Sequence, residues 1–373
     1  MMRVIKMKKL LSVVIAVILI NFIFTGCKTR ENDRRSEYIK YQKSFFDTFD
    51  TLTQVVGYTK TEEEFDSYVE RIHERFRELH KLYDIYNNYE GINNIKSIND
   101  NAGIQPVKVD KEIIDLILFS KDWYDRTEGH VNIALGPVLR IWHDYREMGE
   151  FNPVDAKLPP MEKLREAARY TDINKVIVDT ESSTVYLADK NMSLDVGAVA
   201  KGYATEIVAQ EIMKEGFNSG ILSPGGNVRV LGKPLDGIRD KWGVAIQNPD
   251  KSILPDNENI LDTAFLNNAS VVSSGDYQRY YIVNGKPIHH LINPKTLMPA
   301  EYYRAVTVVT EDAGLGDLLS TAVFLMPYEK SRNLVEGIEG VEALWVMQDN
   351  NIQITKGMED ILYSYGASGS EKK

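Results

Sequence analysis

The chain has 373 residues, of which 43% are hydrophobic and 26% are charged, and this composition excludes a disordered or fibrous protein. Its formal net charge is -10, whereas binding to nucleic acid requires a basic surface that neutralises phosphates. We therefore expect no nucleic-acid partner. A small anionic nucleotide held by backbone amides and a metal ion is compatible with this charge.

The first 26 residues have the pattern of a targeting segment. A start with basic residues and no acidic ones is followed by an apolar run over residues 10–24 and by Cys27, the single cysteine. This run is shorter than the roughly 20 apolar residues that span a bilayer. Either the segment is an ordinary signal peptide or anchor helix, or it is a bacterial lipoprotein signal cleaved before Cys27. Thr25 and Gly26, both small, favour lipidation of the Cys27 sulfur.

The lipoprotein interpretation gives a simple domain organisation. Residues 1–26 form the signal peptide, residues 27–43 form a polar tether, residues 44–365 form one folded domain and residues 366–373 form a flexible tail. We then expect the mature protein on the extracytoplasmic face of the cell membrane, held by its lipid. A single cysteine also excludes a disulfide framework and a thiolate zinc site.

Hydrophobic periodicity predicts the elements of the first half of the chain. We expect a strand over 45–58, a helix over 62–86, a loop over 87–103 and a second helix over 111–127. Gly136 and Pro137 either start a helix, with proline in its first turn, or belong to a functional Gly-Pro segment. A hairpin pairing residues 175–179 with residues 184–187 follows.

The second half mixes strands and helices without regular alternation. We expect helices over 198–215, 315–325 and 329–336, and strands over 193–196, 220–222, 228–231, 242–247, 268–273, 280–283, 305–309, 343–347 and 352–355. This irregular order favours an α+β fold of mixed sheets with packed helices over a doubly wound sheet.

The first of four polar, glycine-marked blocks spans residues 194–204. A strand ends near Asp195, and a helix then begins whose free amides and partial positive charge suit a phosphate. Lys201 in the first turn is unfavourable for the helix itself, and a bound anion would offset that cost. The alternative is a tight strand–helix turn with a solvated lysine, because neither the P-loop nor the dinucleotide fingerprint is satisfied.

The second and third blocks follow further strands. Gly225 and Gly226 permit positive φ and close approach of a ligand, although a simple hairpin turn has the same sequence. Ser274, Gly275 and Asp276 place a hydroxyl and an acid at a strand end.

Two consecutive histidines, His289 and His290, come after the third block. On a strand they would point to opposite faces, so only one can enter a site. Either histidine is equally explained as a hydrogen-bonded surface or core residue.

The fourth block contains Asp317 and Thr321, four residues apart in a predicted helix and therefore on one face. Carboxylate and hydroxyl oxygens suit Mg²⁺, which is usually held by one or two carboxylates together with waters and substrate phosphates. The alternative is an aspartate that favours the helix N-terminus and a threonine that bonds back to a carbonyl.

In this order, the four blocks resemble the FAD:protein FMN transferase (ApbE) family, over about residues 46–350. The resemblance implies an ApbE-like fold with one site for FAD, as substrate, and Mg²⁺. It implies Asp317, Thr321 and the main-chain carbonyl of Ala198 as metal ligands. The residues that it implies for the FAD pocket are Thr51, Asp195, Lys201, Gly225, Gly226, Ser274, Gly275, Asp276 and His290.

The sequence departs from the family pattern in two places. Phe49-Asp50-Thr51 stands where Met-Gly-Thr is usual. The family's His-x-x-Asp-Pro-x-Thr-Gly has become a segment from His290 to Leu297 with Asn293 in place of the acid. The second change removes an acid and a glycine from a loop, whereas the metal pair is unaffected.

The implied reaction is the Mg²⁺-dependent transfer of FMN from FAD to a Ser or Thr hydroxyl of a target protein, with release of AMP. His290 and Asp276 are the candidate catalytic bases. The resemblance implies acceptors such as flavin-carrying subunits of Rnf-type or sodium-pumping quinone reductase complexes. The alternatives are an Mg²⁺-dependent FAD pyrophosphatase and a flavin-binding lipoprotein without catalysis.

Overall fold

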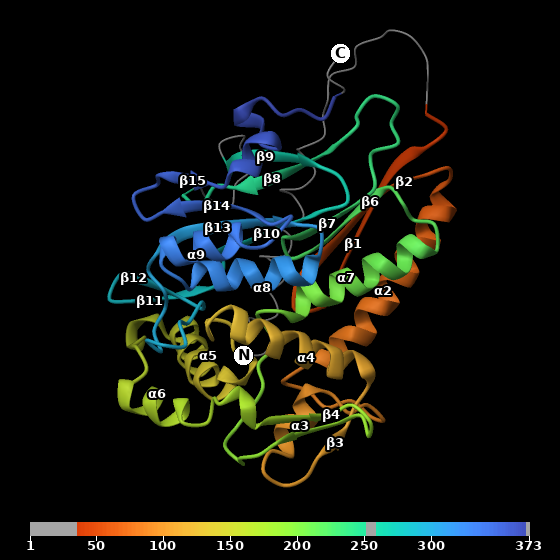
Figure 1. Cartoon of the computed structure of the whole chain (residues 1–373). Coiled ribbons are helices and arrows are strands. Elements are labelled where there is room, and N and C mark those ends of the chain that lie inside the picture. Colours follow the sequence, from red (N-terminus) through yellow and green to blue (C-terminus); the bar gives the residue numbers. More distant parts are fainter. Residues whose placement is uncertain (1–35, 251–258, 371–373) are drawn as a thin grey trace.

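The structure, a computed structural model, describes residues 36–250 and 259–370 (Figure 1). The predicted signal peptide, the predicted lipidation site Cys27 and the first part of the predicted tether lie outside these residues. Within the described ranges, no helix has both the length and the hydrophobicity needed to cross a bilayer.

An antiparallel sheet of eight strands forms the centre of the molecule, in the order β1-β2-β6-β7-β10-β13-β14-β15 (Figure 1). The inner strand β13 is buried along most of its length, because both faces of the sheet are covered. The strands are β1 (Ile39–Thr48), β2 (Thr51–Thr59), β6 (Gly220–Pro224), β7 (Asn227–Leu231), β10 (Ser270–Gly275), β13 (Tyr303–Thr310), β14 (Glu342–Met347) and β15 (Ile352–Ile354).

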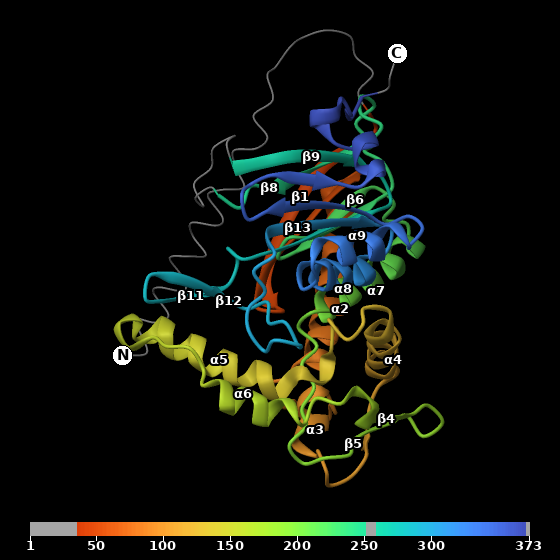
Figure 2. The same ribbon diagram turned by 60° about the vertical axis from the view of Figure 1, so that its left-hand side comes forward.

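Helices cover one face of this sheet, and a two-stranded ribbon covers the other (Figure 2). The helices are α2 (Glu62–Tyr83), α7 (Ala200–Lys214), α8 (Ala313–Phe324) and α9 (Tyr328–Glu336), and the ribbon pairs β8 (Trp242–Gln247) with β9 (Ile260–Leu266). The apolar stripe predicted on α2 is confirmed, since its residues from Phe65 to Leu82 at helical spacing are buried.

A second group of elements lies mostly beyond the helix layer, in the lower part of Figure 1, with one short ribbon at the left of the view. The predicted hairpin of β4 and β5 is confirmed, and so is a helix that starts at Gly136 with Pro137 in its first turn. The group contains α3 (Ile95–Asp100), α4 (Lys111–Arg126), α5 (Gly136–Phe151), α6 (Met161–Ala168), the sheet β3 (Val107–Lys108), β5 (Thr184–Leu187) and β4 (Val176–Asp179), and the ribbon β11 (Tyr280–Val283) and β12 (Lys286–His289).

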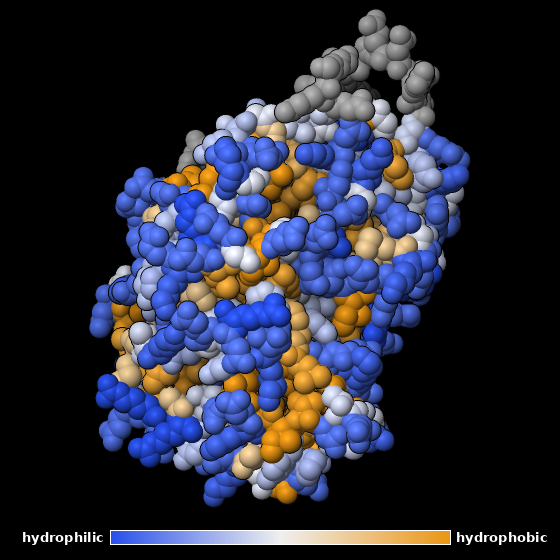
Figure 3. All heavy atoms as spheres, in the orientation of Figure 1, coloured by the Kyte–Doolittle hydropathy of each residue, from blue (hydrophilic) through white to orange (hydrophobic). Residues whose placement is uncertain are grey.

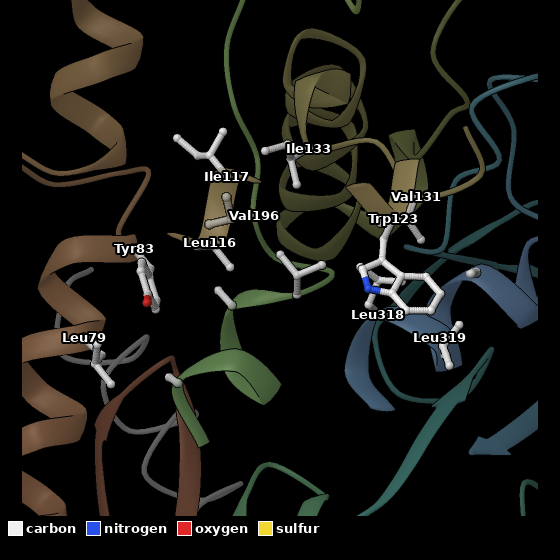
Figure 4. Close-up of a cluster of buried hydrophobic side chains, with 14 of the residues drawn as sticks. Leu79, Tyr83, Leu116, Ile117, Trp123, Val131, Ile133, Val196, Leu318 and Leu319 are labelled. Atoms are coloured by element: carbon white, nitrogen blue, oxygen red, sulfur yellow. The ribbon is translucent and has the colours of Figure 1, made fainter. Parts of the chain in front are cut away.

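One apolar core joins the helix layer to this second group (Figure 4). Because protein interiors are close-packed, elements that share a core hold one another at fixed separations. The core therefore fixes the segments that carry the predicted polar blocks. Its members come from distant parts of the sequence and include Leu79, Tyr83, Leu116, Ile117, Val196, Leu318 and Leu319.

The N-terminal part of the domain differs from the prediction of one strand over 45–58. The chain forms two strands, β1 and β2, with a tight reversal at Phe49 and Asp50, whose φ angles are 52° and 50°. Left-handed backbone is uncommon for such residues, so no sequence signal marked the turn. The Phe49 N–H donates to Nδ1 of His80 at 3.2 Å, and its ring meets Phe76 edge-on, so tertiary contacts stabilise the turn.

The predicted limits of the domain were also wrong. Residues 39–43, assigned to the tether, belong to β1, where Ile39 pairs with Thr59. Residues 366–370, assigned to the flexible tail, are held near the start of β8, because the Asp240 N–H donates to the Gly369 carbonyl at 2.7 Å. Backbone hydrogen bonds of this kind cannot be predicted from the amino-acid composition of a segment.

Two local predictions need correction as well. The predicted loop over 87–103 contains the short helix α3, which Asn94 caps by accepting from the Ser97 N–H. Residues 193–196 join no sheet. The segment is fixed instead by the Asp195 N–H, which donates to the Ile133 carbonyl, and by the Leu194 N–H, which donates to Asn99.

The face shown in Figure 3 is mainly hydrophilic, with apolar side chains in separate patches. Exposed large apolar residues are scattered over the described part of the chain and include Ile104, Phe151 and Val154. Single apolar residues of this kind are normal on a folded surface.

Glu206 ties the sheet to two helices, and we expect its loss to destabilise the fold strongly. From α7 it accepts from Nε of Arg229 on β7 at 2.9 Å and from the Ala313 N–H of α8 at 2.8 Å. The Arg229 side chain is buried, and that of Glu206 is 13% exposed. Glu206→Ala leaves the Arg229 charge unpaired, which should lower the free energy of unfolding in urea by about 3–5 kcal/mol. Glu301→Ala, which breaks an exposed pair with Lys286, should cost less than about 1 kcal/mol. Equal losses would contradict this assignment.

Candidate functional site

A cavity of about 1270 Å³ opens between the sheet with its helices and the group that contains α5 and β11. Its walls come from chain segments that are far apart in the sequence, and each of the four predicted blocks contributes residues. The predicted site residues that line it are Thr51, Asp195, Ala198, Lys201, Gly225, Gly226, Ser274, His290, Asp317 and Thr321. A smaller groove between α5 and α6 is lined by none of them.

The close crossing of α7 and α8 positions the first and fourth blocks. A Cβ on Gly202 would lie 2.2 Å from the Ala313 carbonyl oxygen and 2.4 Å from Cβ of Asp317, so only glycine fits here. The Gly202 N–H donates to Oδ2 of Asp317 at 2.9 Å, and Nζ of Lys201 lies 3.3 Å from Oδ1. The buried Asp317 carboxylate is thus oriented by a backbone amide and balanced by one ammonium group.

Thr321 lies one turn further along α8 and also lines the cavity. Within the described part of the chain its hydroxyl makes no hydrogen bond, so it does not bond back to a helix carbonyl. The alternative structural interpretation of Thr321 therefore fails. One carboxylate and one free hydroxyl on adjacent turns are hard oxygen donors that fit Mg²⁺.

The candidate metal site contains few charged groups. No group of three or more His, Cys, Asp or Glu side chains in metal-binding proximity occurs among the residues that the structure describes. Asp317 and Thr321, with the nearby Ala198 main chain in the cavity wall, would leave the other coordination positions to water and ligand. This pattern suits Mg²⁺, which commonly keeps several waters and substrate phosphates.

The glycine turn between β6 and β7 forms another part of the wall. Gly225 and Gly226 have φ angles of 57° and 87°, as the sequence predicts. A Cβ on Gly225 would lie 2.2 Å from Oγ1 of Thr51, and its N–H donates to the Leu52 carbonyl. The turn is therefore packed directly on the start of β2, which brings Thr51 into the site.

The third block divides between the cavity and its surroundings. The Ser274 hydroxyl lies 2.9 Å from that of Ser320, which donates to the Asp317 carbonyl, so Ser274 supports α8. Gly275 and Asp276 do not line the cavity.

Asp276 instead forms an ion pair with Arg304, which also contacts Asp250. Burial raises the pKa of Asp276, and Arg304 opposes this shift. Arg304 lies on β13, whose register places it beside Asp276. This ion pair could not be predicted from the spacing of residues in the sequence. It holds Asp276 outside the cavity lining, in which we had predicted that it would lie.

The two histidines have separate environments, as their alternation on a strand predicts. His289 is buried, with Nε2 bonded to the Ala300 carbonyl and Nδ1 accepting from the Leu291 N–H. His290 lines the cavity, and burial, followed by the nearby Arg279 charge, lowers its pKa to about 3. The ring of His290 is therefore neutral near pH 7.

The hydrogen bond of His290 selects its tautomer. Its Nδ1 lies 3.2 Å from the Arg279 carbonyl oxygen, which can only accept, so Nδ1 carries the proton. Nε2 is then unprotonated. His290 offers a fixed hydrogen-bond acceptor at the cavity wall.

Asp195 is a second cavity residue with an altered ionisation. Burial raises its pKa, while the Gly197 N–H, which donates to Oδ1 at 2.9 Å, favours the charged form. His143 and Arg146 of α5 act in the same direction as the Gly197 amide. A carboxyl group balanced in this way can accept or donate a hydrogen bond to a polar ligand.

Several cavity residues were missed by the sequence analysis. Tyr86, whose ring lies 5.5 Å from that of His143, and Arg146, which bonds to His143, form one wall. Arg279, three residues after Asp276, and Asn227, directly after the glycine turn, also line the cavity. Arg279 and Asn227 lie next to predicted blocks in the sequence, so their contribution could have been predicted. No feature of the sequence indicated that α5 packs against these blocks.

A helix N-terminus, a glycine turn and a carboxylate–hydroxyl pair around one cavity define an α+β protein with a site suited to a phosphorylated ligand. The chain belongs to the ApbE family, whose sequence profile matches residues 49–345. The fold predicted from the sequence is thereby confirmed.

Named relatives agree with this membership. The chain is similar to the FAD:protein FMN transferase of Treponema pallidum, at 28% identity over 71% of this chain and 74% of the relative. The FAD:protein FMN transferase of Klebsiella pneumoniae is 27% identical over 77% of this chain and 85% of the relative. The ApbE protein of Thermotoga maritima superposes with a TM-score of 0.74 at 26% identity, over 86% and 98%. The Pseudomonas stutzeri flavinyl transferase ApbE shares the fold, with a TM-score of 0.72 at 20% identity, over 91% and 100%.

Replacing Gly202 by alanine tests the helix crossing. The added Cβ would overlap the Ala313 carbonyl and Asp317, so α7 and α8 must separate. We expect the free energy of unfolding to fall by about 1–3 kcal/mol, as for other overpacked cores. Gly243→Ala, where a Cβ would meet only side-chain atoms at 3.1 Å or more, is the control. Similar urea curves for the two variants would show that the crossing tolerates a methyl group.

The lowered pKa of His290 predicts a pH dependence of stability. An unfolded histidine binds a proton below about pH 6.5, whereas folded His290 stays neutral until about pH 3. The unfolded state therefore binds more protons between these values, and stability falls as the pH decreases from 7 to 5. His290→Gln should remove about 2 kcal/mol of that decrease at pH 5. Parallel pH profiles of unfolding for the wild type and the variant would argue against a neutral His290.

Proposed function

We propose that this protein transfers FMN from FAD to a Ser or Thr hydroxyl of a target protein, with Mg²⁺, and releases AMP. The observation that carries the proposal is the Asp317–Thr321 pair of α8, held beside the first turn of α7 in a cavity of about 1270 Å³. Membership of the ApbE family, with relatives named FAD:protein FMN transferase, supports the choice of ligand and reaction.

The reaction is phosphoryl transfer. The acceptor oxygen bonds to the FMN phosphorus, the bond from that phosphorus to the bridging oxygen breaks, and AMP leaves with this oxygen. The hydroxyl proton passes to a base or to water. The first-turn amides of α7 and the Lys201 ammonium would bind the pyrophosphate, since both attract anions.

Asp317, Thr321 and the Ala198 carbonyl would hold the metal ion in this proposal. When bound, Mg²⁺ supplies charge neutralisation on the pyrophosphate. The Gly202 amide keeps the Asp317 carboxylate oriented, and the α7–α8 crossing keeps Lys201 close to it. Pre-organised groups of this kind need little rearrangement during reaction.

His290 is the better of the two predicted candidates for the base. Its neutral ring has an unprotonated Nε2, and it lines the cavity, whereas Asp276 is paired with Arg304 outside the lining. A base with a pKa of about 3 is weak, so His290 would mainly orient the acceptor hydroxyl by accepting its hydrogen bond.

The proposal includes a cellular location. The basic and apolar start of the chain and Cys27 suit an exported lipoprotein anchored to the extracytoplasmic face of the membrane. There the enzyme would meet acceptor proteins such as flavin-carrying subunits of Rnf-type or quinone reductase complexes.

Asp317→Asn is the test of the metal site. The amide keeps the size of the side chain but removes its charge, so Mg²⁺-dependent AMP release from FAD should fall at least about 100-fold. The assay uses the full chain in detergent with FAD, Mg²⁺ and a flavin-acceptor domain. It records AMP and a fluorescent flavin band that survives denaturing electrophoresis.

Asp262→Asn is the matched control, because Asp262 is hydrogen-bonded on β9 but does not line the cavity. It should keep the wild-type rate. Undiminished AMP release by Asp317→Asn would overturn the metal assignment. In the wild type, AMP without a covalent band would indicate a pyrophosphatase, and flavin binding without AMP would indicate a binding lipoprotein.

A further inference from the structure

Asn227 has an unusual environment at the edge of the cavity. It is the first residue of β7, directly after the Gly225–Gly226 turn, and it lines the cavity while only 2% exposed. Neither its Oδ1 nor its Nδ2 has a hydrogen-bond partner among the residues that the structure describes. Among the residues that the structure describes, each of the others with a buried, unpaired side-chain atom has one such atom, whereas Asn227 has two.

The alternation of β7 shows which way Asn227 faces. Arg229, two residues further on, reaches Glu206 on α7, whereas the intervening Val228 and Val230 pack with the β8–β9 layer. Residues two apart share a face of a strand, so Asn227 also faces the helices.

Pairing across the sheet locates Asn227 more closely. It lies opposite Val272 of β10, and Cγ2 of Val272 is 2.9 Å from where a Cβ on Gly316 of α8 would lie. Gly316 precedes Asp317 in the chain. Asn227 therefore lies under the part of α8 that carries the candidate metal ligand.

A second buried asparagine, Asn94, has a structural role, and its amide group is fully hydrogen-bonded. Asn94 is fully buried, and its Nδ2 donates to the carbonyls of Lys81 and Asn87 while its Oδ1 accepts from the Ser97 N–H. Buried polar groups are almost always paired in this way, because an unpaired one is costly. An amide left with two unpaired atoms in a cavity wall is a candidate for pairing with a ligand.

The chemistry of an amide restricts the ligand group. Nδ2 donates and Oδ1 accepts, so a phosphate oxygen, which only accepts, would leave Oδ1 unpaired. A hydroxyl group can accept from Nδ2 and donate to Oδ1. In FAD, the hydroxyls nearest the pyrophosphate belong to the ribityl chain on one side and the ribose on the other.

We propose that the Asn227 amide binds a hydroxyl of the ligand next to the pyrophosphate, and that this contact completes its hydrogen bonding. The inference rests on the proposed function, since it takes FAD as the ligand. It adds to that function a residue that recognises the sugar or sugar-alcohol part of the substrate.

Asn227→Leu separates a ligand contact from a structural role. Leucine is similar in size and removes two polar atoms that have no protein partner, so the melting temperature without ligand should stay equal or rise. The dissociation constant for FAD should increase about 10- to 100-fold, as expected for the loss of one or two hydrogen bonds. Both are measured on the full chain in detergent, with flavin fluorescence titrations in the absence of Mg²⁺.

Asn94→Leu is the matched control with the opposite expectation. Asn94 does not itself line the cavity and its hydrogen bonds are satisfied, so the melting temperature should fall while FAD affinity is kept. Titrations with FMN and ADP distinguish the two hydroxyl sources. A loss confined to FMN assigns the ribityl chain, and a loss confined to ADP assigns the ribose.

Two results would overturn the inference while the proposed function stands. One is wild-type FAD affinity in Asn227→Leu, and the other is a drop in its melting temperature equal to that of Asn94→Leu. A wild-type protein that binds no FAD would instead refute the proposed function, and the inference with it.

Discussion

The contact between α7 and α8 at Gly202 is the constraint on which the site depends. The missing side chain of Gly202 allows the Ala313 carbonyl and Asp317 to approach the α7 backbone, and the Gly202 N–H then orients the Asp317 carboxylate. One turn further along α7, Glu206 bonds both to α8 and to Arg229 on the sheet. The orientation of the candidate metal-binding carboxylate is therefore a direct result of how the helices pack on the sheet.

This arrangement explains how residues distant in the sequence form one cavity. The sheet side contributes strand ends and the glycine turn, where backbone lies close to the ligand space, and the opposite side contributes α5 and the segment after β11. The shared apolar core, to which Val196 belongs, keeps the two sides at a fixed separation (Figure 4). The positions of the polar groups in the walls are therefore set by the packing of the core behind them.

The sequence was informative wherever the signal was local. The Asp317–Thr321 spacing, the α2 stripe and the separation of His289 from His290 follow from the periodicity of one element. The glycine turn follows from the freedom of glycine to adopt positive φ. Features set by tertiary contacts could not be predicted. They include the left-handed turn at Phe49, the pairing of Asp276 with Arg304, and the approach of α5, which brings His143 and Arg146 to the cavity.

The polar groups in and around the cavity fall into two classes, those hydrogen-bonded within the protein and those without a protein partner. Asp317, Ser274 and His289 are paired within the protein, and these bonds fix α8 and the loop around the site. The Thr321 hydroxyl and the Asn227 amide lack partners in the described chain, although they line the same cavity as Asp317 and Ser274. Unpaired polar groups reduce the stability of the ligand-free protein, and these two are placed where a bound ligand could pair with them. Asp317 serves both purposes in the proposed function, because its hydrogen bond to the Gly202 N–H orients the carboxylate that would hold the metal ion.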